Sequence, residues 1–242
     1  YGRESHVVRN FFGVLNAAET PDGRFRVLWH GTIGQGSQRI RDDRGAPVIG
    51  RPEMVAEFFD GAGIAQTVDA VRARFGRPIN YAVIGLGTGA MTCRAGEGDT
   101  VTFYELDPDV IRFARNPKLF SYISECGPDT KIVQGDARLT LAAASAKPYD
   151  LIFVDAFLGA AIPTHLLTRE AMAMYFGKLG PNGIVAVHVL EPRPAPTQAH
   201  AALAARARIA AGAIIEDGDH ETAAGAARGN RDGSTALAWR HG

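Results

Sequence analysis

Alternating polar and apolar positions near the start of the chain are typical of β-strands. Two apolar-rich runs, at residues 7–15 and 25–29, lie on either side of Pro21-Asp22-Gly23, whose residue types favour a tight turn. This arrangement predicts a β-hairpin. Residues 39–51 are rich in Gly, Pro and Asp and predict a loop.

Helical periodicity follows over residues 52–75, although Gly61 and Gly63 interrupt it, so we expect one broken helix or two short ones. Beyond residue 78, short apolar runs alternate with helical stretches, which is typical of an α/β protein with a doubly wound parallel sheet. The expected strands span residues 81–85, 101–106, 131–134, 149–155 and 183–189, with late strands at 213–216 and 236–240. The expected helices span residues 107–115, 163–179 and 198–211, and an irregular loop covers 217–234.

The composition is that of a folded globular protein, because 46% of the 242 residues are hydrophobic and 21% are charged. Lys plus Arg and Asp plus Glu number 26 each, so the formal net charge is zero. A general binder of nucleic acids or anionic membranes normally carries an excess of positive charge. No apolar run reaches the roughly 18 residues that a membrane span needs, and no secretory signal is visible. We therefore expect no nucleic-acid partner and no membrane segment within this chain.

The two cysteines, Cys93 and Cys126, belong to no C-x-x-C pair and to no Cys/His cluster. The sequence therefore signals neither a zinc site nor a disulfide framework. A reducing compartment is the default for such a chain, and we expect a cytoplasmic protein without a metal.

The first candidate for chemistry is the glycine-rich segment Gly85-Leu86-Gly87-Thr88-Gly89, which lies between an expected strand and a short helix. Glycines at such a bend let the backbone approach a ligand closely, because a side chain would fill that space. Tight packing of strand against helix favours the same residues, so the segment alone does not identify a ligand. No Gly-Lys-Ser/Thr follows it, which excludes a Walker phosphate loop.

Acidic residues follow the next strand. Glu105 comes 20 positions after Gly85, a spacing at which a carboxylate hydrogen-bonds the ribose hydroxyls of a bound nucleoside. Asp107 precedes Pro108 at the start of an expected helix and is suited to cap that helix. We assign ribose binding to Glu105 and helix capping to Asp107.

Two further carboxylates, Asp136 and Asp155, come directly after the third and fourth expected strands. The carboxyl ends of parallel strands meet at one edge of the sheet, and ligands bind there where the strand order reverses. Four apolar residues at 151–154 precede Asp155, so a buried strand is expected to deliver this carboxylate to the rim. Helix capping is the alternative role for both residues.

The order of these motifs resembles the spermidine synthase (polyamine aminopropyltransferase) group of class I methyltransferase-like folds, and in particular its diverged spermidine-synthase-like branch. The resemblance extends over roughly residues 8–190 and becomes poor after Glu191. The segments that carry it are residues 11–15, 30–32, 83–89, 103–108, 135–138, 149–157 and 161–170.

The resemblance implies a small N-terminal β-hairpin unit, placed at residues 1–50, and a Rossmann-like nucleoside-binding catalytic domain at residues 51–242. This domain would bind S-adenosylmethionine or decarboxylated S-adenosylmethionine as a co-substrate and act on a small-molecule amine or another nucleophilic acceptor. Asp155 would orient or deprotonate the attacking amine. The donor-side residues implied are Gln38, Gly85, Gly87, Thr88, Gly89, Glu105, Asp136 and Ala137. The resemblance also implies a homodimer.

Within that implied scheme, each residue has a part. Glu105 would bind the ribose, Asp136 the adenine amino group, and the glycine segment the thioether side, while Gln38 would touch the sulfur-bearing portion. On the acceptor side, Phe157 is a candidate contact, and His165 is a candidate second base or contact, with packing or capping as the alternative. His188 lies within an apolar strand and is expected to be a core residue.

Departures from the family pattern concern the acceptor and the donor's tail. Thr88 stands where family members carry an Asp that holds the aminopropyl ammonium, and residues 157–161 are uncharged where they carry a second acid. The usual Tyr-His-Glu element is missing, and Phe58-Phe59 lie near its place. A dicationic acceptor would therefore be poorly matched, because buried ammonium groups need paired acids.

Four functions stay open on the sequence. Aminopropyl transfer is the inherited activity, and methyl transfer from S-adenosylmethionine is a close alternative that Thr88 permits. A nucleoside-binding module without turnover is the third. A nicotinamide-dependent oxidoreductase is the fourth, since Gly85-x-Gly87-x-x-Ala90 fits a dinucleotide fingerprint, although the short span before the second strand weakens it.

Overall fold

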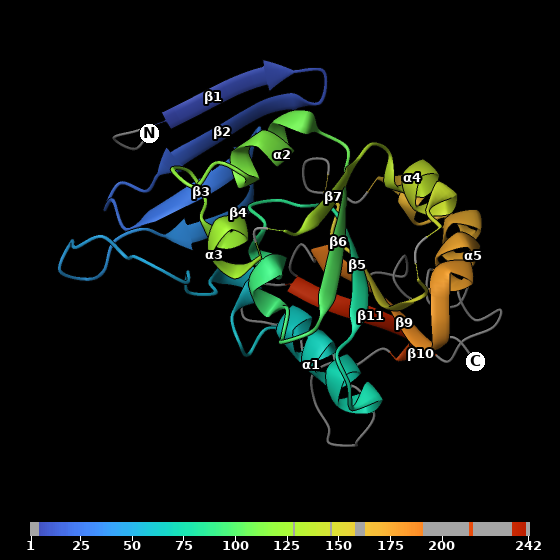
Figure 1. The fold of residues 1–242 in the computed structure, drawn as a ribbon. Helices are drawn as coiled ribbons and strands as arrows, with labels where there is room; N and C mark the ends of the chain where they lie inside the picture. Colours follow the sequence, from blue (N-terminus) through green and yellow to red (C-terminus); the bar gives the residue numbers. More distant parts are fainter. Residues whose placement is uncertain are drawn as a thin grey trace.

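Two β-sheets and the helices packed on them make up the part of the chain that the structure describes (Figure 1). In this computed structural model, a 4-stranded antiparallel sheet precedes a 7-stranded, mostly parallel sheet. The α/β fold expected from the sequence is thus confirmed. The residues described are 5–127, 129–145, 147–157, 163–190, 213–214 and 234–240.

The N-terminal sheet has four strands in chain order, where the sequence predicted one hairpin. The predicted hairpin is the second of three, and its turn closes with a hydrogen bond from the Gly23 N–H to the Thr20 carbonyl (2.8 Å). The first turn escaped prediction because Phe11 and Phe12 continue the apolar run through it, while the Asn10 side chain accepts the N–H of Phe12 (2.8 Å). The strands are β1 (Ser5–Asn10), β2 (Gly13–Glu19), β3 (Phe25–His30) and β4 (Ile33–Arg39).

The second sheet has the strand order β10-β11-β9-β8-β5-β6-β7. Strands β5 to β9 run parallel to one another, whereas β11 is antiparallel to both β9 and β10. The chain order reverses between β5 and β8, so loops diverge there and leave room for a ligand. The strands are β5 (Asn80–Ile84), β6 (Thr100–Glu105), β7 (Lys131–Gln134), β8 (Tyr149–Val154), β9 (Leu179–Leu190), β10 (Ala213–Ile214) and β11 (Ser234–Arg240).

All five predicted parallel strands are confirmed, and the two late strands lie close to their predicted places. The predicted helix at 198–211 lies outside the described residues, as does nearly all of the predicted loop at 217–234. The division of the chain at residue 50 stays a prediction.

The predicted interruption of the helix in residues 52–75 is confirmed, because a short 3-10 turn precedes α1. The single helix predicted at 163–179 is wrong at its start. Thr168 has extended backbone and its side chain accepts the N–H of Ala171 (3.2 Å), so it caps a helix that begins one residue later. The helices are η1 (Ala56–Phe58), α1 (Gly63–Phe75), η2 (Ala90–Arg94), α2 (Pro108–Ala114), α3 (Tyr122–Cys126), α4 (Ala137–Ala143), η3 (Thr164–Leu166) and α5 (Arg169–Lys178).

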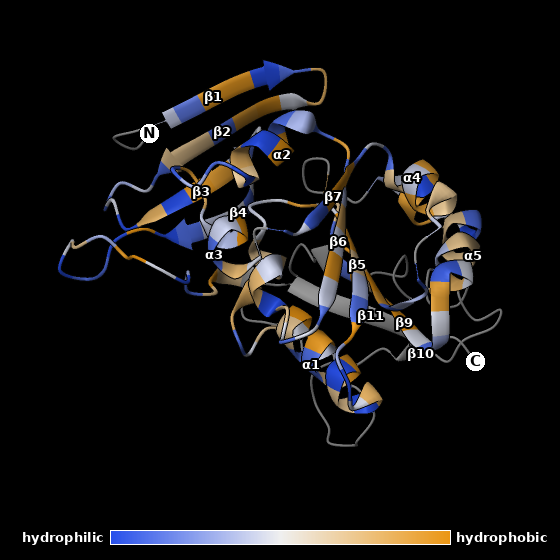
Figure 2. Ribbon diagram, viewed as in Figure 1, coloured by the Kyte–Doolittle hydropathy of each residue, from blue (hydrophilic) through white to orange (hydrophobic). Residues whose placement is uncertain are grey.

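The central strands bury both faces, because successive side chains on a strand point to opposite sides. Tyr81 and Val83 of β5 pack with α1, α2, α3 and the N-terminal sheet, whereas Ala82 and Ile84 pack with α4 and α5. Figure 1 shows α4 and α5 together on one side of the sheet and α1 on the other. Hydrophobic and hydrophilic residues are interleaved along α1, as expected for a helix that buries one side (Figure 2).

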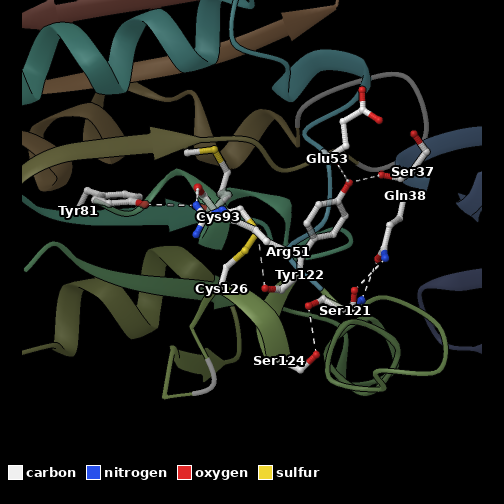
Figure 3. The surroundings of a disulfide bond; sticks show 11 residues. Ser37, Gln38, Arg51, Glu53, Tyr81, Cys93, Ser121, Tyr122, Ser124 and Cys126 are labelled. Atoms are coloured by element: carbon white, nitrogen blue, oxygen red, sulfur yellow. Dashed lines mark hydrogen bonds between the residues drawn. A yellow bond between two sulfur atoms is a disulfide. The ribbon is translucent and has the colours of Figure 1, made fainter. Parts of the chain in front are cut away.

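Cys93 and Cys126 form a disulfide, so the expectation that the sequence holds none is wrong (Figure 3). The bond joins η2 to the end of α3. It was missed because the two residues are 33 positions apart and meet only when η2 and α3 pack together. Disulfides persist in oxidising compartments and are rare in the cytosol. The bond therefore argues against the reducing compartment that the cysteine pattern suggested.

Removal of this disulfide is expected to lower the free energy of unfolding by about 3 to 4 kcal/mol, because the bond closes a loop of 33 residues in the unfolded chain. Urea unfolding of the wild type with and without reductant measures the effect. The double variant Cys93→Ser, Cys126→Ser is the control, and reductant should not change its midpoint. Equal midpoints for oxidised and reduced wild type would contradict the prediction.

No helix in the described part of the chain is long and apolar enough to cross a membrane. Nor do the described residues contain a group of three or more His, Cys, Asp or Glu side chains placed to hold a metal ion.

Candidate functional site

A cavity of about 350 Å³ opens at the carboxyl edge of the parallel strands, where the order reverses between β5 and β8. The segments after β5, β6, β7 and β8 line it, and the N-terminal sheet and η3 complete its wall. Each of the four strand-end features that the sequence singled out contributes to this one cavity. Its lining includes Gly85, Gly87, Glu105, Asp136, Ala137 and Asp155.

The glycine segment is shaped by its protein neighbours. Gly85 has φ of 100°, and a Cβ there would collide with the backbone carbonyl oxygen of Asp155. Gly87 has φ of 53°, and a Cβ there would lie 2.6 Å from the carbonyl oxygen of Gln35. Both glycines therefore let backbone segments pack closely around the cavity, in addition to any ligand.

Gly85→Ala is expected to lower the free energy of unfolding by about 1 to 3 kcal/mol, because alanine is strained at this φ. The collision also displaces the backbone of Asp155, which lines the cavity. Gly177→Ala in α5 is the matched control, since its Cβ meets no atom within 4 Å. Thermal unfolding of both variants tests this, and equal stability of the two variants would contradict it.

Glu105 connects the ends of two strands. Its Oε2 accepts the N–H of Leu86 (2.9 Å), and its Oε1 accepts the N–H of Asp107 (2.8 Å). Burial raises the pKa of Glu105 to about 7, and the two backbone hydrogen bonds oppose that shift. The carboxylate is thus fixed at the cavity wall with free lone pairs that suit hydroxyl donors.

Asp107 caps α2, as the sequence predicted, and accepts the N–H of Asp109 (2.8 Å). The Asn10 side chain also donates to Asp107 (2.7 Å) and to Asp109 (2.8 Å). These bonds attach the β1–β2 turn to the start of α2 and hold the N-terminal sheet over the cavity.

Asp136 has two roles. Its Oδ1 caps α4 by accepting the N–H groups of Arg138 (2.8 Å) and Leu139 (3.3 Å). Its Oδ2 lies 3.3 Å from Nε2 of His165, which belongs to η3. His165 therefore contacts the carboxylate predicted for adenine, and the structure does not pair it with Asp155.

Asp155 pairs with a residue expected to lie in the core. His188 lies on β9, and its Nδ1 is 2.6 Å from Oδ1 of Asp155. His188 is buried, as expected for a core residue, and it also contacts the carboxylate that the resemblance implies for catalysis. The Phe157 ring stands edge-on to the His188 ring, with 5.2 Å between ring centroids, and lines the cavity.

Three residues predicted for the donor side lie outside the cavity lining. The side-chain amide of Gln38 exchanges hydrogen bonds with Ser121, at 2.9 Å to its hydroxyl and 2.8 Å from its N–H (Figure 3). Thr88 is 1% exposed and packs against Gly36, and a Cβ on Gly89 would touch Ile123. Gln35 lines the cavity in place of Gln38.

Among the lining or site residues that sequence reasoning did not assign to the site are Phe12, His30, Gln35 and His188. The first three come from the N-terminal sheet, whose position over the cavity depends on contacts between distant segments. For His188 the signal was partial, because strands β8 and β9 were both predicted but the register between them was not.

The charges around the cavity have one dominant sign. Glu105, Asp107, Asp136 and Asp155 line it, together with His30 and His165, and no Lys or Arg is among the described lining residues. Such a wall favours a cationic ligand, such as a sulfonium or an ammonium group, and disfavours a pyrophosphate.

Comparison with known proteins gives a consistent result. No family model matches the chain. A polyamine aminopropyltransferase from Vibrio vulnificus is 32% identical over 114 residues, which cover 45% of this chain and 37% of the relative. The chain thus aligns with less than half of that protein's length.

Solved structures with the same fold include spermidine synthases. A probable spermidine synthase from Corynebacterium glutamicum has a TM-score of 0.63 at 15% identity, and the match covers 98% of this chain and 80% of that protein's chain. Spermidine synthase from Thermotoga maritima has a TM-score of 0.61 at 15% identity, and the match covers 98% of this chain and 72% of that enzyme's chain. Human methyltransferase-like protein 13 has a TM-score of 0.50 at 16% identity, and the match covers 74% of this chain and 79% of that protein's chain. The chain is therefore similar in sequence to a polyamine aminopropyltransferase and has the fold of spermidine synthases within the class I methyltransferase-like group.

Proposed function

We propose that this chain is a transferase that binds an adenosyl-sulfonium co-substrate and transfers its aminopropyl group to a small-molecule amine. The observation that carries the proposal is the convergence of Glu105, Asp136 and Asp155 on one acidic cavity at the strand-order reversal. The similarity to a polyamine aminopropyltransferase supports the reaction class.

The donor's nucleoside would lie between the ends of β5, β6 and β7. Glu105 would accept hydrogen bonds from the ribose hydroxyls, and Asp136 would accept one from the adenine amino group, which the free lone pairs of both carboxylates allow. Two proteins of related fold were solved in complex with AdoDATO or SAH. They are a spermidine synthase with the transition-state analogue AdoDATO and methyltransferase-like protein 13 with SAH.

The chemical step is a displacement at carbon. The amine nitrogen forms a bond to the carbon beside the sulfonium, while the carbon–sulfur bond breaks and its electron pair stays on sulfur. The products are the aminopropylated amine, methylthioadenosine and a proton, and Asp155 would accept that proton. Most of the acceleration comes from holding nitrogen, carbon and sulfur in line, and the proton acceptor adds to it.

Methyl transfer from S-adenosylmethionine is the second candidate, and Thr88 is the observation that favours it. A buried neutral hydroxyl stands where the resemblance expects a carboxylate for the aminopropyl ammonium. The intact donor carries its own carboxylate beside its ammonium, so it depends less on that missing charge.

The identity of the nucleoside product separates these functions. The purified chain is incubated with decarboxylated S-adenosylmethionine or S-adenosylmethionine and a panel of monoamines and diamines, and products are identified by mass spectrometry. Methylthioadenosine together with an aminopropylated amine supports aminopropyl transfer. S-adenosylhomocysteine with a methylated acceptor would replace that proposal by methyl transfer, and no donor consumption would favour a nucleoside-binding module.

A further inference from the structure

The sheet register places His188 beside Asp155. Strands β8 and β9 are parallel, and their paired residues include Phe153 with Ala186 and Val154 with Val187. One step further along both strands brings Asp155 level with His188. Neighbouring residues in register point to the same face of a sheet, so the two side chains meet, with 2.6 Å between Nδ1 and Oδ1.

Aromatic rings fix the imidazole in this place. His188 is 4% exposed. The Phe153 ring is stacked on it, with 6.5 Å between centroids and 18° between planes, and the Phe157 ring stands edge-on at 5.2 Å. The imidazole therefore contacts both rings while its Nδ1 faces the carboxylate. Side chains locked in this way hold catalytic groups more accurately than mobile ones do.

The hydrogen bond has a defined direction when Asp155 is ionised. An ionised carboxylate only accepts hydrogen bonds, so Nδ1 of His188 carries the proton and donates it to Oδ1. Oδ2 of Asp155 is then the oxygen left for an acceptor at the cavity, which Asp155 lines.

We propose that His188 is a positioning residue for Asp155: its Nδ1–H holds one carboxylate oxygen so that the other faces the nucleophile of the acceptor. This inference rests on the proposed function, in which Asp155 accepts the proton. It predicts that His188 affects the chemical step and leaves donor binding unchanged, because in the proposed function Glu105 and Asp136 bind the nucleoside and Asp155 serves the acceptor.

Two substitutions separate positioning from packing. His188→Leu keeps an apolar side chain against Phe153 and Phe157 but removes the Nδ1–H hydrogen-bond donor. It should lower kcat about 100-fold, which is the cost of a misplaced catalytic group. His188→Asn retains an N–H near the position of Nδ1 and should restore kcat to within about tenfold of the wild type. Affinity for methylthioadenosine, measured by calorimetry, should stay the same in both variants. His6→Leu on exposed β1 is the control and should match the wild type.

Equal kcat losses in both variants, or a loss of nucleoside affinity as large as the loss of kcat, would overturn the proposal. A second measurement does not need turnover. Nitrogen-15 NMR of the histidine side chains in the full chain should show His188 protonated at Nδ1, with a strongly shifted proton that changes in Asp155→Asn. An unprotonated Nδ1 would overturn the positioning role. This NMR signal in a protein that consumes no donor would support the pair while contradicting the proposed function.

Discussion

Asp155→Asn should abolish group transfer while leaving the affinity for methylthioadenosine nearly unchanged. Asparagine has the same shape and its oxygen can still accept the hydrogen bond from His188, but it cannot take up the proton that the attacking amine releases. Loss of a positioned proton acceptor typically costs a factor of about 10² to 10⁴ in rate. Steady-state kinetics and calorimetric titration of the same preparation measure the two effects.

Asp129→Asn, at an exposed position, is the control for the change of charge and should behave as the wild type does. A large loss of nucleoside affinity in Asp155→Asn would place this carboxylate on the donor rather than on the acceptor. Unchanged turnover would remove Asp155 from the chemistry.

The second prediction concerns the pH dependence of donor binding through Glu105. Its pKa is raised to about 7 by burial, and the ionised form is the better acceptor for ribose hydroxyls. Below pH 7 the ligand must first drive off the proton, so affinity for methylthioadenosine should rise with pH by up to about tenfold per unit and level off above 7. Calorimetry in buffers of different ionisation enthalpy should detect proton release at pH 6.

Glu105→Gln is the matched variant, because it keeps the shape and removes both the charge and the titration. Its affinity should be lower by roughly 1.5 to 3 kcal/mol at pH 8 and should vary little between pH 6 and 8. A variant with the pH profile and affinity of the wild type would contradict the ribose assignment.

The titration of Glu105 also affects stability, and it does so in the opposite direction: the free energy of unfolding falls as the pH rises, whereas the affinity for the nucleoside increases. The carboxyl group has an ordinary pKa of 4.5 and a folded pKa of about 7, so the folded state holds the proton to higher pH. Its contribution to the free energy of unfolding is therefore present below about pH 4.5 and is lost as the pH rises to about 7. Glu105→Gln should remove this loss in urea unfolding.

Much of the fold could be predicted because the parallel strands contain short apolar runs, such as residues 151–154 of β8, and helical stretches alternate with them. Strand β7 has the predicted bounds, and Asp107 caps α2 as its place before Pro108 indicated. The gathering of Glu105, Asp136 and Asp155 also followed from sequence, since the carboxyl ends of parallel strands share one edge.

What could not be predicted depends on contacts between distant segments. The Asn10 side chain forms the first turn of the N-terminal sheet inside an apolar run. Gln38 is engaged by Ser121, 83 positions away, and Gln35 takes the place at the cavity. The pairing of His188 with Asp155 depends on the register of β9, which begins irregularly, so counting along the sequence does not determine it.

The measurement that tests the central claim most directly is a calorimetric titration of the purified chain with methylthioadenosine, S-adenosylmethionine, decarboxylated S-adenosylmethionine and NAD. An acidic nucleoside cavity predicts saturable binding of methylthioadenosine and of at least one sulfonium donor, and no binding of NAD. Binding of NAD alone, or of none of the four compounds, would contradict the account.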